Sequence, residues 1–279
     1  MLITCWGSRG SIPVSGTDYI KYGGDTTCIE IRTKCDDIII IDAGTGIRRL
    51  GNRLVDENQY KYNFIFTHAH WDHVMGFPFF KPLYSEQAEL ILYGCPFHRK
   101  FVESILSKLM APPYFPVGYS EIKATMKYLG AFTTEFEIGS VTVTPIQLNH
   151  PDNGSGYKFT EDGKSFVFLT DNELGFMHPG GLSYKDYIEF STGTDLLIHD
   201  AEYTPEEYKS TIKWGHSVFT DVLDLALEAG VGQLGLFHLN QERTDRQMDE
   251  IVETCRQRIA DKQNKLECFA VGCDMMFNL

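Results

Sequence analysis

One short segment, FIFTHAHWDH at residues 64–73, constrains this chain more than any other part of its sequence. Its apolar first part is typical of a buried strand, which leads directly into His68, His70, Asp72 and His73. His68 and His70 are two residues apart, so their side chains project from the same side of an extended backbone. Because imidazole is the commonest metal-binding side chain, the segment predicts a metal site at a strand end. Asp72 and His73 lie at the turn, where they can face a second ion.

The composition is that of an ordinary globular protein. Of the 279 residues, 43% are hydrophobic and 23% are charged, and we expect a single domain over residues 1–279. The sequence has no apolar run of about 18 residues and no signal-peptide pattern at its start, so we expect neither a membrane span nor a leader. The seven cysteines are widely spread and include no CxxC pair, as expected for reduced thiols in the cytoplasm.

The formal net charge of −13 at pH 7 bears on the kind of partner. A negative surface repels a long polyanion, because nucleic-acid binding depends on Lys and Arg contacts to phosphates. Long nucleic acid is therefore disfavoured as a partner, and a small substrate is favoured.

Short apolar runs alternate with amphipathic stretches along the chain. We predict strands at Leu2–Trp6, Cys28–Thr33, Asp37–Asp42, Asn63–Thr67, Glu89–Tyr93, Ser140–Leu148, Ser165–Thr170, Asp195–His199, Gln233–Phe237 and Glu267–Val271. We predict helices at Ile47–Glu57, Arg99–Met110, Ser217–Ala229 and Thr244–Lys262. This order favours an α/β fold of stacked sheets with helices outside over a doubly wound sheet. No GxGxxG motif opens a helix after the first strand, so nothing indicates dinucleotide binding.

The motif THAHWDH resembles the signature of metallo-β-lactamase-fold hydrolases, and the resemblance extends along essentially the whole chain. It implies a four-layer αββα sandwich with a metal site at one edge of the sheets. In that family a histidine follows a later strand, an aspartate closes a hydrophobic strand, and a late histidine closes another. The corresponding positions here are His150 after Val141–Leu148, Asp171 after Phe166–Leu169 and His238 after Gln233–Phe237.

The resemblance also implies ligands for two divalent ions. One ion is expected at His68, His70 and His150, and the other at Asp72, His73 and His238. Asp171 is expected to bridge the two ions through its two carboxylate oxygens. These nitrogen and oxygen ligands suit Zn²⁺, which we expect, and also Mn²⁺ or Fe²⁺.

Three further segments resemble the phosphodiesterase branch of the family, which includes ribonuclease Z and cyclic-nucleotide phosphodiesterases. They are LNHPDNGSGY around the third histidine, LLIHDAEYT at residues 196–204 and WGHSVFTDVLDLALEAG at residues 214–230. The resemblance implies that His216 is a general acid or a clamp on the phosphate, and that Asp200 accepts a hydrogen bond from its other ring nitrogen. Asp72 is counted as catalytic as well as metal-binding. The alternatives are that His216 only neighbours a helix capped by Ser217, and that Asp200 is a surface carboxylate.

Together these features predict a dinuclear metal phosphodiesterase that acts on a small phosphodiester such as a 3′,5′-cyclic nucleotide. Hydrolysis of a carboxylic ester, thioester or lactone at the same ions is the first alternative. A tRNA 3′-processing endonuclease is the second, although the basic, glycine-rich arm that would grip RNA is not evident. A metal-binding module without catalysis is the third, and the complete ligand set argues against it.

The remaining segments leave their roles open. The glycine-rich segments 7–16 and 22–28 either approach a phosphate or make tight turns. The proline-broken segment 111–119 is a lid, a contact in a homodimer or a packed loop. His98, His178 and His199 match no motif, and we expect them to be structural or exposed.

Overall fold

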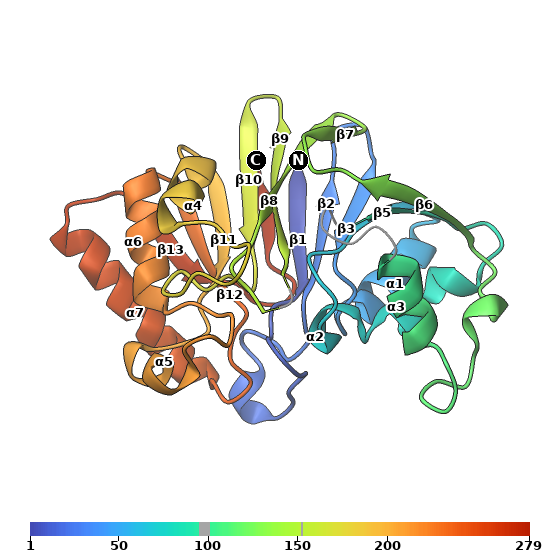
Figure 1. Ribbon diagram of the computed structural model, residues 1–279, viewed down its shortest axis with the longest axis horizontal. Coiled ribbons are helices and arrows are strands. Elements are labelled where there is room, and N and C mark those ends of the chain that lie inside the picture. The colour runs from blue at the N-terminus through green and yellow to red at the C-terminus, as the bar shows by residue number, and fades with distance from the viewer. Residues whose placement is uncertain (95–100, 152) are drawn as a thin grey trace.

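The computed structural model describes residues 1–94, 101–151 and 153–279, whose strands form two seven-stranded sheets (Figure 1). The first sheet has the order β14 (Met276–Asn278), β1 (Leu2–Gly7), β2 (Cys28–Arg32), β3 (Ile38–Ile41), β4 (Lys61–Ile65), β5 (Glu89–Gly94) and β6 (Thr125–Ala131). The second has the order β13 (Glu267–Ala270), β12 (Gln233–Phe237), β11 (Leu196–Asp200), β10 (Lys164–Leu169), β9 (Ser155–Glu161), β8 (Val141–Gln147) and β7 (Phe136–Ile138).

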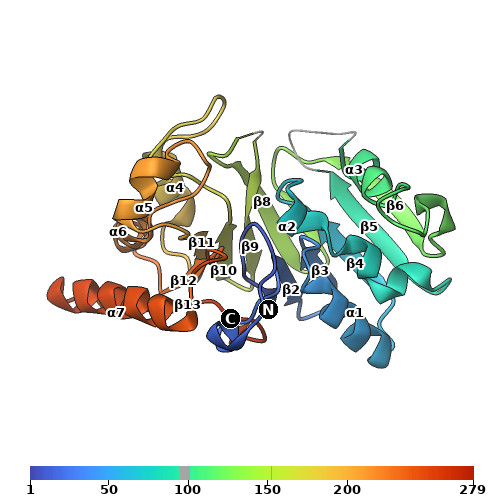
Figure 2. The ribbon, with the colours of Figure 1, turned by 90° about the horizontal axis from the view of Figure 1, so that it is seen from below.

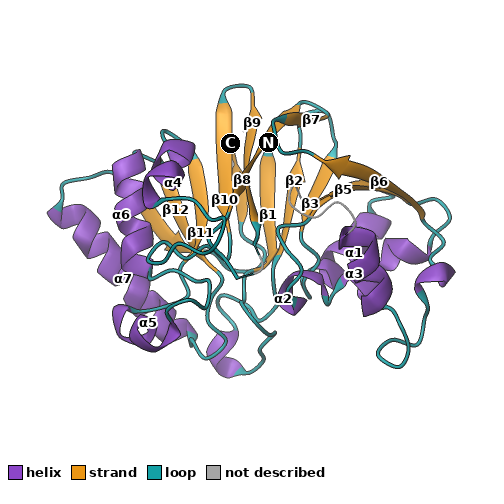
Figure 3. Cartoon of the chain, viewed as in Figure 1, coloured by secondary structure: helices purple, strands orange, loops and turns teal. Residues whose placement is uncertain are grey.

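Helices cover the outer face of each sheet, and the two sheets face one another between them (Figures 2 and 3). The helices are α1 (Ile47–Asp56), α2 (Trp71–Val74) and α3 (Phe101–Leu109) beside the first sheet, and α4 (Tyr184–Ser191), α5 (Pro205–Thr211), α6 (Phe219–Ala229) and α7 (Asp245–Asp261) beside the second. The predicted four-layer αββα sandwich is therefore confirmed.

Strand β3 shows why the sequence folds into these layers. Its four isoleucines are all buried, and successive side chains of a strand point to opposite faces. Ile38 and Ile40 pack with α1 in the core outside the first sheet. Ile39 and Ile41 pack in the core between the sheets. A continuous β-branched run is what a strand buried on both faces requires.

Every predicted element is present with its ends shifted by a few residues, and Arg99, the predicted start of the second helix, lies outside the described residues. The structure adds β6, β7, β9, β14, α2, α4 and α5, which we did not predict. Strand β9 was missed because GSG at its start is typical of a turn, whereas pairing with β8 and β10 makes it a strand. The start predicted for the helix Ser217–Ala229 was also wrong. That helix, α6, begins at Phe219 with Val218 as its N-cap, and the Ser217 hydroxyl donates to the carbonyl of Asn172 instead.

Parallel pairing brings several strand ends to one edge of the molecule. Strands β3 and β4 are parallel neighbours in the first sheet, as are β10, β11 and β12 in the second. Their carboxyl ends carry Asp42, His68, Asp171, Asp200 and His238. The loops that leave these strands gather at that edge (Figure 3). Among the described residues, no helix is both long and apolar enough to span a membrane.

Candidate metal centre

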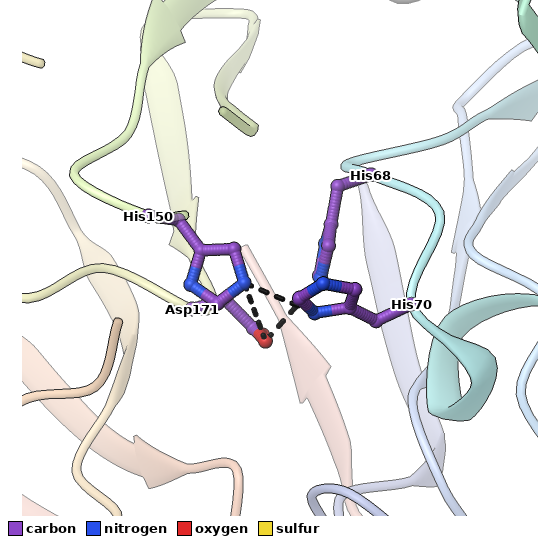
Figure 4. A group of neighbouring side chains, drawn as sticks. All are labelled: His68, His70, His150 and Asp171. Carbon is purple, nitrogen blue, oxygen red and sulfur yellow. Dashed lines mark hydrogen bonds and ion pairs between the residues drawn. The ribbon is translucent and has the colours of Figure 1, made fainter. Parts of the chain in front are cut away.

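The first group of candidate ligands consists of His68, His70, His150 and Asp171, whose ligand atoms all lie within 4.8 Å of one another (Figure 4). Nε2 of His150 lies 3.1 Å from Nδ1 of His70. Asp171 Oδ2 lies 3.5 Å from Nε2 of His68 and 4.0 Å from Nε2 of His150. His70 is exposed while the other three are buried, so this group opens toward solvent on one side.

The second group consists of Asp72, His73, Asp171 and His238, all of them buried. Nε2 of His73 lies 3.3 Å from Asp72 Oδ2 and 3.2 Å from Asp171 Oδ1. Nε2 of His238 lies 3.1 Å from Asp72 Oδ2 and 3.4 Å from Asp171 Oδ2. Asp171 is thus common to both groups, with one carboxylate between two sets of imidazoles.

Two buried ring nitrogens without a hydrogen bond test whether these residues fit metal ions. Nε2 of His68 and Nε2 of His73 make no hydrogen bond within the described part of the chain, and each instead faces an oxygen of Asp171, at 3.5 and 3.2 Å. An unsatisfied buried polar atom costs about 1–3 kcal/mol, and a divalent cation is a natural partner for an imidazole lone pair. Histidine and aspartate side chains are also the donor types that Zn²⁺, Mn²⁺ and Fe²⁺ accept. The residues present therefore fit a pair of divalent ions.

Burial and mutual contact shift the pKa values of the group. Burial lowers the pKa of His68 well below its ordinary value and that of His150 to about 3, which keeps both rings in the neutral form that binds metal. Burial alone would raise the pKa of Asp171, but His238, His73 and His68 hold it well below its usual range. The carboxylate thus stays ionised and available as a ligand.

A second layer of contacts fixes the candidate ligands. Nδ1 of His73 lies 2.8 Å from Asp42 Oδ2, and Nδ1 of His238 lies 2.8 Å from Glu202 Oε2. Nδ1 of His150 donates to the carbonyl of Gly215 at 3.1 Å. Such partners fix the tautomer and ring orientation of metal-binding histidines. Sequence reasoning missed Asp42 and Glu202, although Asp42 closes a buried strand and Glu202 follows Asp200 by two residues.

Backbone strain also marks this edge of the sheets. Asp42, Asp171 and His238 adopt left-handed φ angles of 60°, 53° and 55°. Residues other than glycine rarely take this conformation, which costs of the order of 1–3 kcal/mol and concentrates at functional sites. All three residues lie just beyond the ends of strands that supply the candidate centre.

His216 lies beside the two ligand groups. Its Nδ1 is 3.0 Å from Asp200 Oδ2 and 3.5 Å from Glu202 Oε2, and its ring stacks on His238 with centroids 4.5 Å apart. Burial lowers the pKa of His216, but the carboxylates of Glu202 and Asp200 outweigh it and raise that pKa to about 9. Asp200 is fully buried, so the alternative of a surface carboxylate is wrong. The alternative of a Ser217 cap beside His216 is also wrong, as described above.

The structure thus brings together every site residue that the sequence singled out. They are His68, His70, Asp72, His73, His150, Asp171, Asp200, His216 and His238. His199 is buried and bonds the carbonyl of its neighbour Asp200, and His178 is buried against Glu173. His98 lies outside the described residues.

The structure shows what surrounds segments 7–16 and 111–119, whose roles the sequence left open. In segment 7–16, the N–H of Ser11 donates to Asp72 Oδ2 at 2.8 Å, and a Cβ on Gly10 would lie 2.2 Å from the His238 ring. The segment therefore packs on the candidate centre through its backbone. In segment 111–119, Phe115 packs on the core outside the first sheet while Tyr114 is 83% exposed.

Comparison with known proteins agrees with the fold. Residues 38–239 match the family model described as beta-lactamase superfamily domain. Ribonuclease Z from Oceanobacillus iheyensis is 24% identical over 235 residues, which cover 68% of this chain and 74% of the relative.

Two solved structures share the architecture over nearly their whole length. The metallo-beta-lactamase fold protein YhfI from Bacillus subtilis has a TM-score of 0.69 and 18% identity, covering 99% of this chain and 98% of that one. Yeast PDE1 has a TM-score of 0.68 and 16% identity, covering 100% and 99%. The predicted resemblance is confirmed. The chain belongs to the beta-lactamase superfamily, and it is a metal-dependent hydrolase of the metallo-β-lactamase fold.

Proposed function

We propose that this protein is a dinuclear metal-dependent phosphodiesterase that hydrolyses a small phosphodiester, with a 3′,5′-cyclic nucleotide as the leading candidate. The observation that carries the proposal is the position of Asp171 between two groups of candidate ligands. Its oxygens lie 3.2–3.5 Å from Nε2 of His68, His73 and His238. Two-metal sites of this kind are typical of phosphoryl displacement.

In this proposal the side chains divide between two ions. His68, His70 and His150 would hold one ion and Asp72, His73 and His238 the other, and Asp171, which is common to both groups, would serve both. Zn²⁺ is the expected metal, with Mn²⁺ or Fe²⁺ as alternatives. Divalent cations bound there supply Lewis-acid stabilisation of charge on phosphoryl oxygens and lower the pKa of an attacking water.

His216 is the proposed proton donor. Asp200 fixes the ring by accepting from Nδ1, and Glu202 adds negative charge nearby. We infer that a proton on Nε2 of His216 passes to the oxygen that leaves phosphorus. A departing ribose alkoxide is a poor leaving group, so it gains most from this proton.

Charge and exposed aromatic rings support a small nucleotide. The net charge of −13 opposes a long polyanion. Trp71 follows His70 directly and is 75% exposed, and Trp214 precedes Gly215 and is 62% exposed. Exposed indole rings on residues that neighbour His70 and His216 in the chain suit stacking with a nucleobase.

The two tryptophans give a test of the nucleotide proposal. Stacking on an aromatic side chain is worth about 1–3 kcal/mol per base, so Trp214→Ala and Trp71→Ala should raise KM for a 3′,5′-cyclic nucleotide by roughly 5- to 150-fold. The KM for ribose 3′,5′-cyclic phosphate without a base should stay unchanged. Tyr114→Ala, which removes another exposed ring, is the matched control. Equal effects on both substrates would argue against base recognition.

The competing functions predict different substrates. One relative is named ribonuclease Z, so precursor tRNA is the first competitor, and a thioester or lactone is the second. The wild-type protein should be stripped with a chelator, reloaded with Zn²⁺ or Mn²⁺, and assayed on all of these beside cyclic nucleotides and bis-p-nitrophenyl phosphate. We expect metal-dependent turnover of the small diesters. Efficient cleavage of tRNA alone, or of thioesters alone, would overturn the proposal.

Asp171→Asn tests the bridging assignment directly. We expect two metal ions per chain in the wild type, and in the variant loss of one ion with nearly all diesterase turnover. Asp162→Asn changes an exposed aspartate at the far end of β9 and serves as control. Retention of both ions and of turnover in Asp171→Asn would remove this residue from the centre.

The compartment is part of the same proposal. Among the described residues, Cys5, Cys28, Cys35, Cys255, Cys268 and Cys273 are free. We infer that the enzyme acts in the cytoplasm, where thiols stay reduced.

A further inference from the structure

We propose that Glu173 is a positioning residue that fixes the turn at residues 213–215 and, through this turn, both His150 and His216. The inference rests on the proposed function, because it concerns a candidate metal ligand and the candidate proton donor. Glu173 belongs to neither ligand group, and it lies two residues after Asp171 in the chain.

The carboxylate of Glu173 is completely buried and accepts four hydrogen bonds. Its Oε1 accepts from the hydroxyl of Tyr208 at 2.6 Å and from the backbone N–H of Lys213 at 2.8 Å. Its Oε2 accepts from the N–H of Gly215 at 2.8 Å and pairs with Nε2 of His178 at 2.8 Å. Each oxygen therefore holds one backbone group of the turn and one side chain outside it.

The turn needs such an anchor because its backbone is unusual. Lys213 has a φ of 76° and Gly215 a φ of 96°, both in the left-handed region. Trp214 between them is largely exposed, and its N–H donates to the carbonyl of Thr211 at 3.0 Å within the same segment. Two N–H groups bound to one buried carboxylate define where the turn lies.

Residues 213–215 also contact the candidate centre directly. The carbonyl of Gly215 accepts from Nδ1 of His150 at 3.1 Å, which directs Nε2 of that ring toward Asp171 and His70. A Cβ on Gly215 would lie 2.0 Å from Nδ1 of His150, so backbone and ring are in close contact. The next residue is His216. A shift of this one peptide would therefore move a metal ligand and the proton donor together.

Neighbours of Glu173 make the same connection. Its own N–H donates to the carbonyl of Asn149 at 2.8 Å, next to His150. The N–H of Asn172 donates to Asp200 Oδ2 at 3.2 Å, and the carbonyl of Asn172 accepts from Ser217. The segment after β10 thus ties Asp171 to both sides of the His150–His216 contact, whose ring centroids are 5.5 Å apart.

A carboxylate is required because both oxygens face two donors. In Glu173→Gln one oxygen becomes an amide NH₂, which cannot accept from a backbone N–H. In either orientation of the amide, the N–H of Lys213 or of Gly215 loses its acceptor. The substitution keeps the size of the side chain, so it tests the hydrogen bonds rather than the packing.

The experiment compares Glu173→Gln with Glu161→Gln. Glu161 is also a buried carboxylate that accepts from a backbone N–H, that of Lys34, and from a hydroxyl, that of Ser140, but it lies at the far end of β9. The readouts are zinc stoichiometry and affinity by competition with a chelator, the melting temperature, and kcat and KM on a 3′,5′-cyclic nucleotide and on bis-p-nitrophenyl phosphate.

For Glu173→Gln we expect zinc affinity at one of the two ions to fall by roughly 10- to 100-fold, the usual effect of losing a partner of a metal ligand. We expect kcat to fall more on the cyclic nucleotide than on the activated diester, because His216 is displaced too. Glu161→Gln should lower the melting temperature and leave zinc binding and both kcat values unchanged. A lower melting temperature in Glu173→Gln with unchanged zinc affinity and unchanged kcat values would overturn the inference.

Failure of the Glu173 inference and failure of the proposed function can be told apart. If Glu173→Gln does not fold, Glu173→Asp keeps the carboxylate but withdraws it by one methylene from the N–H groups of Lys213 and Gly215, and zinc affinity and cyclic-nucleotide turnover equal to the wild type would overturn the inference. If the wild-type protein hydrolyses no phosphodiester, the proposed function fails. The zinc-affinity comparison still decides the role of Glu173 in that case.

Discussion

His216 contacts the candidate metal ligands without belonging to either group that shares Asp171. If it donates a proton, His216→Ala should keep both ions but lower cyclic-nucleotide turnover by roughly 10²–10⁴-fold. The loss should be much smaller on bis-p-nitrophenyl phosphate, because p-nitrophenolate leaves without a proton. Asp200→Asn should give a milder form of this pattern, since it disturbs the orientation of His216 at a 3.0 Å contact without removing the ring.

Metal analysis and the two assays measured on the same preparations check this prediction. Equal losses on the two substrates would indicate that His216 binds phosphate rather than donating a proton. Loss of an ion from His216→Ala would make it a ligand.

At the scale of elements, the loop between β1 and β2 limits the space around the second ligand group. A Cβ on Gly10 would lie 2.2 Å from the ring of His238, so Gly10→Ala must push the ring or the loop. Because Ser11 of the same loop donates to Asp72, we expect weaker binding of one zinc ion and lower turnover. The control is Gly130→Ala in β6, where a new Cβ meets nothing within 4 Å. Zinc titration of both variants checks this prediction. An unchanged zinc affinity in Gly10→Ala would show that the loop moves aside without disturbing the ligand group.

At the scale of the whole molecule, the charge of −13 should set the response to salt. Turnover of a cyclic nucleotide should barely change between about 50 and 200 mM salt, because a small substrate releases few counterions. Cleavage of precursor tRNA at physiological salt should be far slower. Kinetics over a salt series checks both points, and efficient tRNA cleavage with a steep salt dependence would contradict them.

Metal removal should also affect the molecule as a whole. The candidate ligands come from loops at the ends of strands in both sheets, so ions bound there would link the two halves of the sandwich. A ligand that binds only the folded state at 100 times its Kd adds about 2.7 kcal/mol to the free energy of unfolding. Excess chelator should therefore lower the melting temperature, and added Zn²⁺ should restore it. A melting temperature indifferent to both would argue against a metal that couples the sheets.

The sequence by itself determined the central strands and the candidate ligands of the segment 64–73, and its order of elements favoured stacked sheets with helices outside. The isoleucine run of β3 is buried on both faces as its composition requires. The HxHxDH motif is distinctive by itself, because it places three histidines and an aspartate, all metal-binding types, within six residues. The later positions His150, Asp171 and His238 depended on the family resemblance, because a lone histidine or aspartate after a strand has no distinctive spacing.

Only the tertiary structure decided which buried carboxylates support these residues. Asp42, Glu173 and Glu202 accept from groups far away in the sequence, such as His73, Gly215 and His238. No local pattern marks a carboxylate as a partner of a group 30 or more residues away, as the separations of 31, 42 and 36 residues illustrate. Strand β9 was missed for the same reason: its pairing with β8 and β10, and not its own turn-like start, makes it a strand. Local sequence preference limits which secondary structures a segment can form, while packing and long-range hydrogen bonds decide which of them it adopts.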